Sequence, residues 1–426
     1  MTTPDATDVM PTTASYRLLG HPTDLEGHRA TFGPPPLLSP PTREWRARFA
    51  ALLENSGLSG RGGAGFPSST KLALARSGGR GGLVVANGME GEPASDKDKV
   101  LLLQAPHLVL DGANLLAVAS GANEVVVCVP AGRDQVAQAV HRALLERAAH
   151  GHGAVPERMV RPPDRFVAGE ESALIGWITS GNSLPSFRPD KGSPLRIGRR
   201  VALVHNVETL AHVALIAHGG PDRFRSRGMA EEPGTTLVTI SGAVQHPGVV
   251  EVDRGTPLAD VVARSAPEQT PMALLVGGYA GTWVGPQHFT TPYASLPLRT
   301  IGATAGVGVL VALGPDACGI AETARLAHYL AGQSAGQCGP CVYGLPAIAD
   351  DLTRLAGGRV DPELMARLHR RLSEVDGRGA CRHPDGAVAM VRSALAVFAS
   401  DVTAHAGGTP CLYAARASRL RYPGTT

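Results

Sequence analysis

Cysteines in the C-terminal part of the chain are candidates for metal or redox chemistry. Cys338 and Cys341 form a Cys-x-x-Cys pair, and Cys381 follows 40 residues after the second of them. With only 6 cysteines in 426 residues, such a pair more often marks metal or redox chemistry than a disulfide framework. The pair therefore predicts metal or redox chemistry, and small buried structural thiols are the alternative.

A glycine-dense loop in the N-terminal half is a candidate anion site. Residues 60–67 read GRGGAGFP, and a short polar run leads from them to Lys71. Glycines let the backbone approach a phosphate closely, exposed amides hydrogen-bond to it, and a following helix N-terminus adds its dipole. The loop matches neither the dinucleotide-binding pattern nor the Walker pattern. Phosphate binding and a plain mobile loop both stay open on composition alone.

Acidic and amide residues follow apolar runs and could face a ligand. The segment NGMEGEP, at 87–93, comes directly after the apolar residues 82–86, where open α/β sheets place ligand groups. The pair Glu170 and Glu171 follows a second, shorter apolar run. Paired carboxylates could accept ribose hydroxyls, hold water or stay solvated on a surface. Asn206, in the run HNVETL, could equally be the cap at the start of a helix.

The elements that must position these residues alternate between strand and helix in the first half of the chain. The apolar runs 82–86 and 125–130 predict strands, with a helix over 108–121 between them and another over 134–149 after them. A shorter helix over 45–54 leads into the glycine loop. Strand, helix and strand in this order indicate a βαβ unit and a parallel sheet.

The second half of the chain predicts a change of architecture. From about residue 231 the chain is rich in β-branched residues, and we expect a small β-rich module to about residue 284. An apolar strand is expected over residues 307–313. The rest of the chain has the periodicity of helices, of which the clearest is expected over 387–405 and a shorter one over 367–375. The expected units are a leader, an α/β domain, a β-rich module, a helical domain and a tail, over residues 1–45, 46–230, 231–305, 306–405 and 406–426.

Composition bounds the class of protein. Hydrophobic residues make up 43% and charged residues 18%, so an ordinary globular chain with several cores is expected. The formal net charge of +3 comes without any run of like charges, which gives no support to nucleic-acid binding. The sequence has neither a signal segment nor a long apolar stretch. We therefore expect a soluble cytoplasmic protein.

Taken together, the motifs occur in the order of a known family. The chain resembles the NADH-binding FMN flavoprotein subunit of respiratory complex I through GRGGAGFP, NGMEGEP, AGEESAL, HNVETL, TTLVTISGAVQHPGVVEV, and AGQSAGQCGPC with Cys381. The same family includes the diaphorase subunits of NAD-linked hydrogenases and formate dehydrogenases. The resemblance, from about residue 57 to 402, implies a Rossmann-like FMN domain, a ubiquitin-like β-grasp module of the SLBB type, and a C-terminal helical bundle with one [4Fe-4S] cluster.

The resemblance also implies roles for individual residues. Glu90 and Glu92 would be the catalytic carboxylates near flavin and nicotinamide, and Cys338, Cys341 and Cys381 would be cluster ligands. In that arrangement NADH stacks on the flavin ring, hydride passes to flavin N5, and single electrons leave through iron–sulfur centres. The residues implied to bind FMN or NAD(H) are Gly62, Gly63, Gly65, Phe66, Lys71, Asn87, Glu170, Glu171, Asn206 and Thr209.

Several positions depart from the family pattern in the flavin region. The family has an acid where this chain has Met89 and an asparagine where it has His205. The family's aromatic residue just beyond the lysine is aliphatic here, at Leu72 or Leu74. These changes remove an acceptor near the nicotinamide, alter a flavin contact and weaken adenine stacking. We expect NADH specificity to be less secure than FMN binding.

The cluster site departs more sharply, because the first of the family's three closely spaced cysteines is Ala335 here. Alanine has no donor atom, so a fourth ligand would come from Ser334, His383 or Cys318, or would be absent. A four-iron cluster with an open corner, a three-iron cluster and no cluster all stay open. The remaining cysteines, which we expect to be structural, are Cys128 and Cys411.

The sequence thus predicts an FMN-dependent oxidoreductase that takes hydride from NAD(P)H and passes electrons through an iron–sulfur site. The expected partner is a ferredoxin-like or two-iron reductase protein, or a membrane reductase that would hold the protein at the inner face of the membrane. A non-catalytic docking or scaffold paralogue is the first alternative, and Met89, His205 and Ala335 favour it. A flavin dehydrogenase without a cluster is the second.

Overall fold

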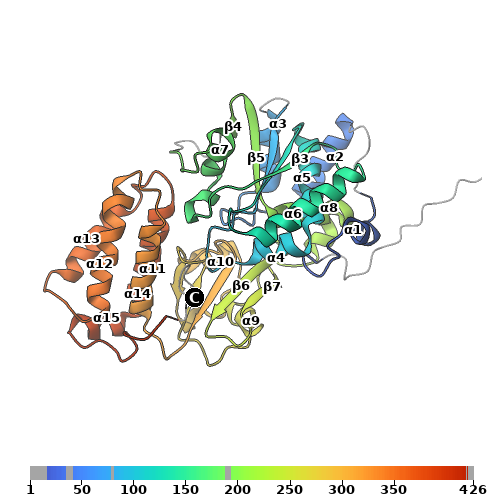
Figure 1. Cartoon of the computed structure of the whole chain (residues 1–426). Helices are drawn as coiled ribbons and strands as arrows, with labels where there is room; N and C mark the ends of the chain where they lie inside the picture. Colours follow the sequence, from blue (N-terminus) through green and yellow to red (C-terminus); the bar gives the residue numbers. More distant parts are fainter. Residues whose placement is uncertain (1–16, 35–41, 78–80, 188–192, 419, 421–426) are drawn as a thin grey trace, which may run out of the picture.

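The chain folds into two sheet-containing units and a C-terminal bundle of helices (Figure 1). The computed structural model describes residues 17–34, 42–77, 81–187, 193–418 and 420. In Figure 1 the first unit runs from blue to green, the second is yellow to light orange, and the bundle is orange to red. The predicted succession of an α/β domain, a β-rich module and a helical region is therefore confirmed.

The first sheet has the strand order β3-β2-β1-β5-β4. Neighbouring strands are parallel except for β4, which is antiparallel to β5 at the edge. The residues of β2 and nearly all of β1 and β5 are buried, as expected for apolar strands covered on both faces. The strands are β1 Leu83–Asn87, β2 Val125–Cys128, β3 Glu157–Val160, β4 Leu195–Ile197 and β5 Arg200–Asn206.

The helices of this unit cover the sheet, and α5 is buried along almost its whole length. It packs against β1 and against α8. A Cβ at Gly112 of α5 would lie 1.8 Å from the Leu210 carbonyl oxygen, so only glycine allows the two helices to come this close. The helices are α1 Leu25–Phe32, α2 Arg43–Ser56, α3 Ser68–Ser77, α4 Lys97–Gln104, α5 Pro106–Ser120, α6 Asp134–Ala149, α7 Glu171–Ser180 and α8 Val207–Arg225, with the 3-10 turn η2 Phe166–Gly169.

The segment that we expected to be a leader contains a folded helix. Asp24 caps α1 by accepting a hydrogen bond from the Gly27 amide at 2.8 Å. His28 of this helix is buried, and its Nε2 lies 2.8 Å from Asp111 Oδ2 of α5. The described part of the segment is thus packed onto the first unit, whereas residues 1–16 and 35–41 lie outside the described residues.

The second sheet has the order β7-β6-β10-β8-β9 and is mainly antiparallel. Its central strand β10 pairs in parallel with β6 and antiparallel with β8. We expected this apolar strand to open the helical domain, so the boundary predicted at residue 306 is wrong and the module extends to Leu313. Its elements are β6 Thr235–Gly242, β7 Gly248–Asp253, α9 Leu258–Ala263, β8 Ala273–Val276, β9 Thr282–Val284, η3 Pro286–His288, α10 Ser295–Thr300 and β10 Val309–Leu313.

The C-terminal bundle consists of five helices and a π-helical turn among the described residues. The stretch that predicted a single helix over 387–405 forms two helices, α14 and α15, with an angle of 84° between them. The chain turns at Phe398, whose buried ring lies 5.3 Å from the ring of Trp283. The elements are α11 Gly319–Gly332, η4 Pro340–Gly344, α12 Leu345–Ala356, α13 Leu364–Val375, α14 His383–Val397 and α15 Ala399–Ala406.

Within the described parts of the chain, no single helix meets the requirements of a membrane span. None of these helices combines the length and the apolar character that a crossing needs. Two sharply bent pairs, α4 with α5 and α14 with α15, meet these requirements only when their two helices are taken together.

Candidate functional site

The carboxyl ends of β1 and β5 bring three of the sequence motifs together. Asn87 and Asn206 are the last residues of these strands and are partners in the parallel register. The Asn87 side chain donates to the Gly169 carbonyl at 2.9 Å. The Asn206 side chain caps α8 by accepting from the Glu208 amide at 3.0 Å. The edge of the sheet at which open α/β folds bind ligands is therefore the edge that carries these residues.

The glycine loop lies against the start of α8. The Arg61 amide donates to Thr209 Oγ1 at 2.8 Å, and the Gly60 amide donates to the Phe66 carbonyl at 2.9 Å. A Cβ at Gly62 would lie 3.2 Å from the Asn206 Cβ, tighter than most real contacts. The loop thus leaves a bare backbone beside a helix N-terminus, which fits a phosphate-bearing group such as FMN.

Two further glycines of the loop adopt backbone angles that favour glycine. Gly63 has φ of 103° and Gly65 has φ of 63°. A Cβ at Gly63 would face the Gly306 carbonyl oxygen at 3.4 Å, whereas nothing described lies within 4 Å of that position at Gly65. The loop is therefore bounded on one side by the β-rich module and open at Gly65.

Lys71 and the acidic pair form a contact between α3 and α7. The Lys71 ammonium is paired with the Glu171 carboxylate and also donates to the Val204 carbonyl at 3.0 Å. Glu170 caps α7, with its carboxylate accepting from the amides of Ser172 at 2.9 Å and Ala173 at 3.1 Å. The predicted acidic pair therefore divides its contacts, since Glu171 binds the lysine and Glu170 is held by the helix that it starts.

Glu90 and Glu92 are held by hydrogen bonds to nearby backbone amides. The Glu90 carboxylate accepts from the amides of Asp98 at 2.8 Å and Lys99 at 3.0 Å, and its φ of 38° places it in the left-handed region. The Glu92 carboxylate accepts from the Tyr279 amide of the β-rich module at 2.9 Å. Burial raises the pKa of both groups to about 7, against the opposing effect of these amides.

A buried network of charges beside Asn206 was missed by the sequence reasoning. The Lys97 ammonium lies 2.6 Å from Asp98 Oδ1 and 2.9 Å from Glu208 Oε2, and it donates to Asn206 Oδ1 at 3.1 Å. The guanidinium of Arg61 lies 4.0 Å from the other oxygen of Glu208. Two cations thus face two carboxylates, and all four side chains are at most 5% exposed.

The network fixes the charge states of its members. Burial lowers the pKa of Lys97, but the carboxylates of Asp98 and Glu208 outweigh burial and raise it above its usual value. For Glu208 burial raises the pKa, and Lys97, His212 and Arg61 outweigh it and lower the value. The one signal in the sequence was that Lys97 is one of only four lysines and stands at the start of a helix, α4, just before its apolar residues.

Three of the residues that depart from the family pattern, Leu72, Met89 and His205, are buried, whereas Leu74 is partly exposed. His205 is 3% exposed, and its Nε2 has no hydrogen-bond partner among the described residues. Burial lowers the pKa of His205 to about 3, and the charge of Lys71 acts in the same direction. Met89 belongs to an apolar cluster, and Leu72 is in the core, where it cannot stack on a ligand. The uncompensated polar atom of His205, which directly precedes Asn206, also fits a site that a ligand completes.

The three predicted cluster cysteines converge at one end of the helical bundle. Cys341 lies in the π-helical turn, a feature that often marks functional sites, and its amide donates to the Cys338 carbonyl at 3.1 Å. Burial raises the pKa of the Cys341 thiol to about 12, and the thiols of Cys338 and Cys381 act in the same direction. Burial also raises the pKa of Cys381, with Glu170 and Cys338 contributing. The three thiols fit three corners of a cluster.

The fold removes one of the candidates for the missing fourth ligand. Cys318 precedes α11 and Cys338 follows it, so a 14-residue helix separates them, which is roughly 20 Å at the α-helical rise. Ser334 and Ala335 lie in the turn between α11 and the π-helical turn. His383 is buried, with Nε2 2.7 Å from the Leu330 carbonyl oxygen and Nδ1 without a partner among the described residues. Ser334 and His383 remain candidates.

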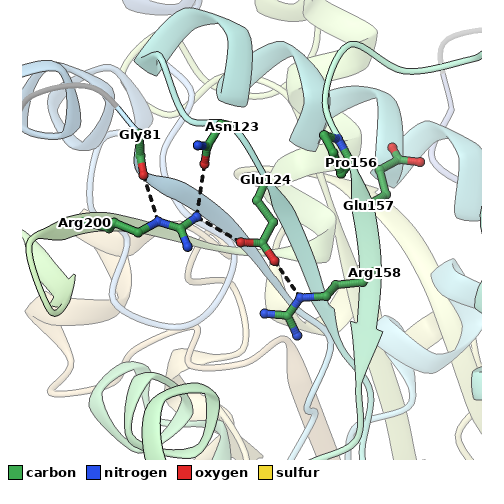
Figure 2. A pocket seen from close by; sticks show the side chains of 7 residues that line it. All are labelled: Gly81, Asn123, Glu124, Pro156, Glu157, Arg158 and Arg200. Carbon is green, nitrogen blue, oxygen red and sulfur yellow. Dashed lines mark hydrogen bonds and ion pairs between the residues drawn. The ribbon is translucent and has the colours of Figure 1, made fainter.

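A pocket of about 400 Å³ lies at the opposite edge of the first sheet (Figure 2). It is lined by residues at the beginnings of the strands, including Glu124, Arg158 and Arg200. Glu124 lies 2.6 Å from Arg158 and 2.9 Å from Arg200, so both guanidinium groups are paired (Figure 2). The predicted residues Asn87 and Asn206 lie at the carboxyl ends of the strands, and none of the predicted site residues lines this pocket.

Models of known domain families match three parts of the chain. The Nuo51 FMN-binding domain matches residues 53–215, the SLBB domain matches 237–266, and the iron–sulfur binding region of NADH-ubiquinone oxidoreductase-F matches 321–405. The order of the three matches is the order of the units in the structure. The predicted fold class and the predicted FMN and iron–sulfur binding regions are confirmed.

Curated relatives cover most of the chain. The F-type subunit of the NADH-quinone oxidoreductase of Mycobacterium bovis is 29% identical over 387 residues, which cover 87% of each chain. Its counterpart in Salmonella typhimurium is 28% identical, covering 84% of each chain. Both similarities extend across all three units of the fold.

Solved structures agree with these matches. A chain of an NAD+-reducing [NiFe]-hydrogenase in the air-oxidized state is 29% identical, with a TM-score of 0.77 over 86% of this chain. This chain spans only 64% of that hydrogenase chain. The roles of the individual site residues stay predictions. By its three domain matches and by these relatives, the chain is similar over most of its length to the NADH-binding FMN flavoprotein subunits of complex I and to a chain of the NAD+-reducing hydrogenase, and it is an electron-transfer oxidoreductase of this type.

Proposed function

We propose that this chain takes hydride from NAD(P)H at a flavin site formed by the glycine loop and the carboxyl ends of β1 and β5. FMN, when bound, supplies the step between two-electron and one-electron chemistry. The electrons would then leave through an iron–sulfur site at Cys338, Cys341 and Cys381 toward a partner protein. The protein's own contribution is to hold the donor, the flavin and the cluster site in fixed positions.

The observation that carries this proposal is a short segment that touches both sites. The 3-10 turn η2 ends at Gly169, whose carbonyl accepts from Asn87 at the flavin edge at 2.9 Å. At the other end of the turn, the ring of Phe166 lies 5.3 Å from the ring of His383. His383 comes two residues after Cys381. The two sites are therefore bridged by four residues, which supports electron transfer between them.

The proposed roles of the flavin-site residues follow their positions. Gly62, Gly63, Gly65 and Phe66 would hold the phosphate through the loop backbone, and Thr209 anchors that loop. The backbone donors that bind Glu90 and Glu92 would fix these catalytic acids before substrate arrives. The other proposed contacts of FMN or the nicotinamide nucleotide are Lys71, Asn87, Glu170, Glu171 and Asn206.

The proposed electron acceptor is a ferredoxin-like or two-iron reductase protein that docks beside the cluster cysteines. Tyr343 and Val342 follow Cys341 in the π-helical turn and are 77% and 43% exposed. Exposed apolar side chains next to a redox site suit a protein partner, since aromatic residues are enriched at interface cores. We propose that the complex works in the cytoplasm, with a membrane reductase as the other candidate acceptor.

The test begins with anaerobically purified full-length protein and measures flavin content, iron content and electron paramagnetic resonance before and after NADH. We expect about one FMN per chain, bleaching of the flavin absorbance by NADH, and a new iron–sulfur signal on reduction. Protein without flavin, or flavin that NADH and NADPH leave oxidised, would disprove the proposal. The matched control is the exposed pocket variant Arg158→Ala, which should keep all three signals.

A flavin dehydrogenase without a cluster is the second candidate, and Ala335 favours it. Among the described residues, no fourth cysteine lies beside Cys338, Cys341 and Cys381, because Cys318 is at the far end of α11. The same experiment separates the two functions. Flavin reduction by NADH with no protein-bound iron, under strictly anaerobic conditions, would support the second candidate over the first.

A further inference from the structure

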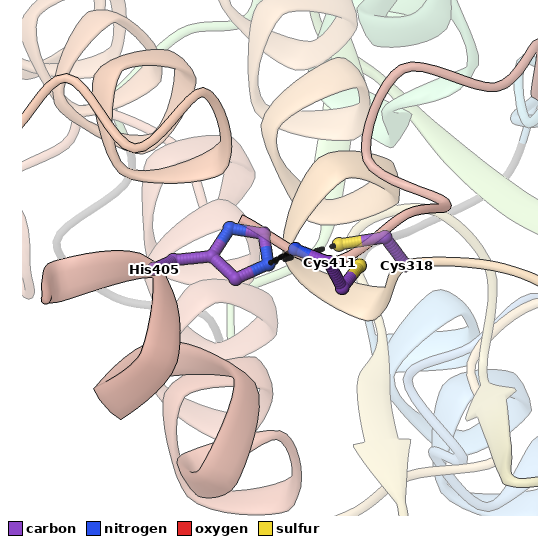
Figure 3. Close-up of side chains that lie close together, drawn as sticks. All are labelled: Cys318, His405 and Cys411. Atoms are coloured by element: carbon purple, nitrogen blue, oxygen red, sulfur yellow. Dashed lines mark hydrogen bonds between the residues drawn. The ribbon is translucent and has the colours of Figure 1, made fainter. Parts of the chain in front are cut away.

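The helical bundle contains a second group of potential metal ligands, at the end opposite to the cluster cysteines. Cys318, His405 and Cys411 come from the start of α11, the end of α15 and the tail, and Figure 3 shows their side chains directed toward one another. Their ligand atoms all lie within 4.8 Å of one another. Cys318 is 2% exposed, and His405 is fully buried.

The geometry of the group resembles that of a tetrahedral ion site. Cys318 Sγ lies 3.8 Å from His405 Nε2. Two ligands of one Zn²⁺, a sulfur at about 2.3 Å and a nitrogen at about 2.0 Å, would be roughly 3.5 Å apart. We propose that Cys318, His405 and Cys411 bind a Zn²⁺ ion that fastens the tail of the chain to the bundle. This site is independent of the flavin and of the iron–sulfur cysteines.

Groups around the three side chains prepare them for an ion. The His405 ring nitrogen Nδ1 lies 3.3 Å from the Leu355 carbonyl oxygen, which directs Nε2 to the two sulfurs, and such a contact is usual for metal-binding histidines. Cys318 Sγ accepts a hydrogen bond from the Ala321 amide at 3.4 Å, which fixes the sulfur at the first turn of α11. The Cys411 amide lies 3.1 Å from Nε2, so ion binding would replace one hydrogen bond by a coordinate bond.

The fourth ligand position would face an open pocket. A pocket of about 260 Å³ is lined by Cys318 together with Asp316, Glu322 and Tyr413. This space can admit a water molecule, which commonly completes the coordination of Zn²⁺ with three protein ligands. Binding would follow the balance Zn²⁺ plus two thiols and a neutral imidazole, giving the bound ion and two released protons.

A second buried group of potential metal ligands is less suited to a cation, because a positively charged side chain already lies beside it. His28, Asp111 and His152 also lie within 4.8 Å of one another. Their carboxylate, however, lies 2.7 Å from the guanidinium of Arg147. A cation in that position would meet an arginine, whereas the described hydrogen bonds of the Cys318 group come only from backbone groups and from one another.

The experiment uses reduced full-length protein in which Cys338 and Cys341 are replaced by serine, so that the cluster site cannot take up the ion. Zn²⁺ is titrated in competition with a chromophoric chelator, and Co²⁺ is added separately to record its thiolate charge-transfer and ligand-field bands. We expect one ion per chain and the spectrum of a tetrahedral site. Adding Cys411→Ser should weaken binding by at least about 100-fold, and adding Cys128→Ser should not.

Circular dichroism checks that each variant is folded. Three results would overturn the proposal. Equal Zn²⁺ affinity of the Cys411→Ser and Cys128→Ser proteins would place the ion elsewhere. Absence of binding to the folded parent protein would leave the group without an ion. A Cys318–Cys411 disulfide, detected by mass spectrometry in protein purified without reductant, would assign the two thiols to redox chemistry instead. Because Cys411 is partly exposed in the tail, its serine variant is expected to fold.

Discussion

The flavin-binding unit and the helical bundle bury polar groups in opposite ways. In the first, Lys97 and Arg61 face Asp98 and Glu208, so the protein neutralises its own buried charges. In the second, thiols and imidazoles gather with few charged partners, at Cys338, Cys341 and Cys381 and again at Cys318, His405 and Cys411. A network that compensates itself needs no ion, whereas clustered thiols are stabilised by one.

The two regions also differ in the source of their rigidity. The Lys97 network ties α4, α8 and the glycine loop together from within, so the flavin edge is formed in advance of any ligand. The cysteines of the bundle lie close together in different segments and in the tail, and a bound metal would link them. Removing a buried charge should therefore lower the stability of the first region. Changing the number of cysteine ligands should change metal binding in the second.

The largest effect is expected for Lys97→Met. The substitution leaves the carboxylates of Asp98 and Glu208 buried without their nearest cation, which should lower the free energy of unfolding by about 3–5 kcal/mol. The matched control is Lys99→Met, because Lys99 and Asp96 form a pair that is 37% and 22% exposed and is worth at most about 1 kcal/mol. Urea unfolding measures both, and equal midpoints for the two variants would contradict the prediction.

The acid stability of the first unit should depend on His205. Its pKa is lowered to about 3 in the folded protein, so the unfolded chain binds the proton first as pH falls below about 6.5. Stability from this group is present above that pH and is lost as pH falls toward about 3.

His205→Asn should remove this loss, which amounts to roughly 3 kcal/mol at pH 4 because pH 4 is about 2.5 units below the unfolded pKa. The measurement is urea unfolding at pH 7 and pH 4. The control is the same substitution at His246, which is exposed. If the His205→Asn protein loses as much stability between pH 7 and pH 4 as the wild type, His205 is not the group responsible for that loss.

A smaller effect is expected for Thr209→Val. This change removes the acceptor of the Arg61 amide and should cost about 1–3 kcal/mol while loosening the glycine loop. Thr323→Val is the control in the bundle, since its buried hydroxyl donates to a carbonyl within its own helix. FMN titration should show weaker binding for Thr209→Val only. Unchanged flavin affinity would mean that the loop does not depend on this anchor.

The smallest effect on folding, within about 0.5 kcal/mol, is expected for Ala335→Cys. The position is half-buried in the turn before Cys338 and Cys341, and a thiol there would supply the fourth ligand of the proposed cubane cluster. Anaerobic protein should hold about four irons per chain and keep them longer in air than wild type. Ser334→Cys is the neighbouring control. Identical iron content in both variants and wild type would show that Ala335 does not limit the cluster.

The regularity of the chain explains which parts of the fold the sequence could predict. The helix over 134–149 was predicted with the observed bounds, since its apolar positions recur at helical spacing and Asp134 starts it. The domain boundary predicted at residue 306 was wrong. A long connection separates β10 from the preceding strands of its sheet, and no local sequence pattern indicates that β10 pairs with β6. The bend at Phe398 failed for the same reason, because it is fixed by packing against Trp283.

Residue types and spacing were enough to predict a flavoprotein and to single out its glycine loop, its acidic pairs and three candidate cluster cysteines. Only the tertiary structure brought Lys97 to Glu208, which are 111 residues apart, and Cys318 to His405 and Cys411. It also excluded Cys318 as a cluster ligand through the length of α11. The physical reason is that charge compensation and ligand geometry are decided by distance in space, which local sequence patterns do not contain.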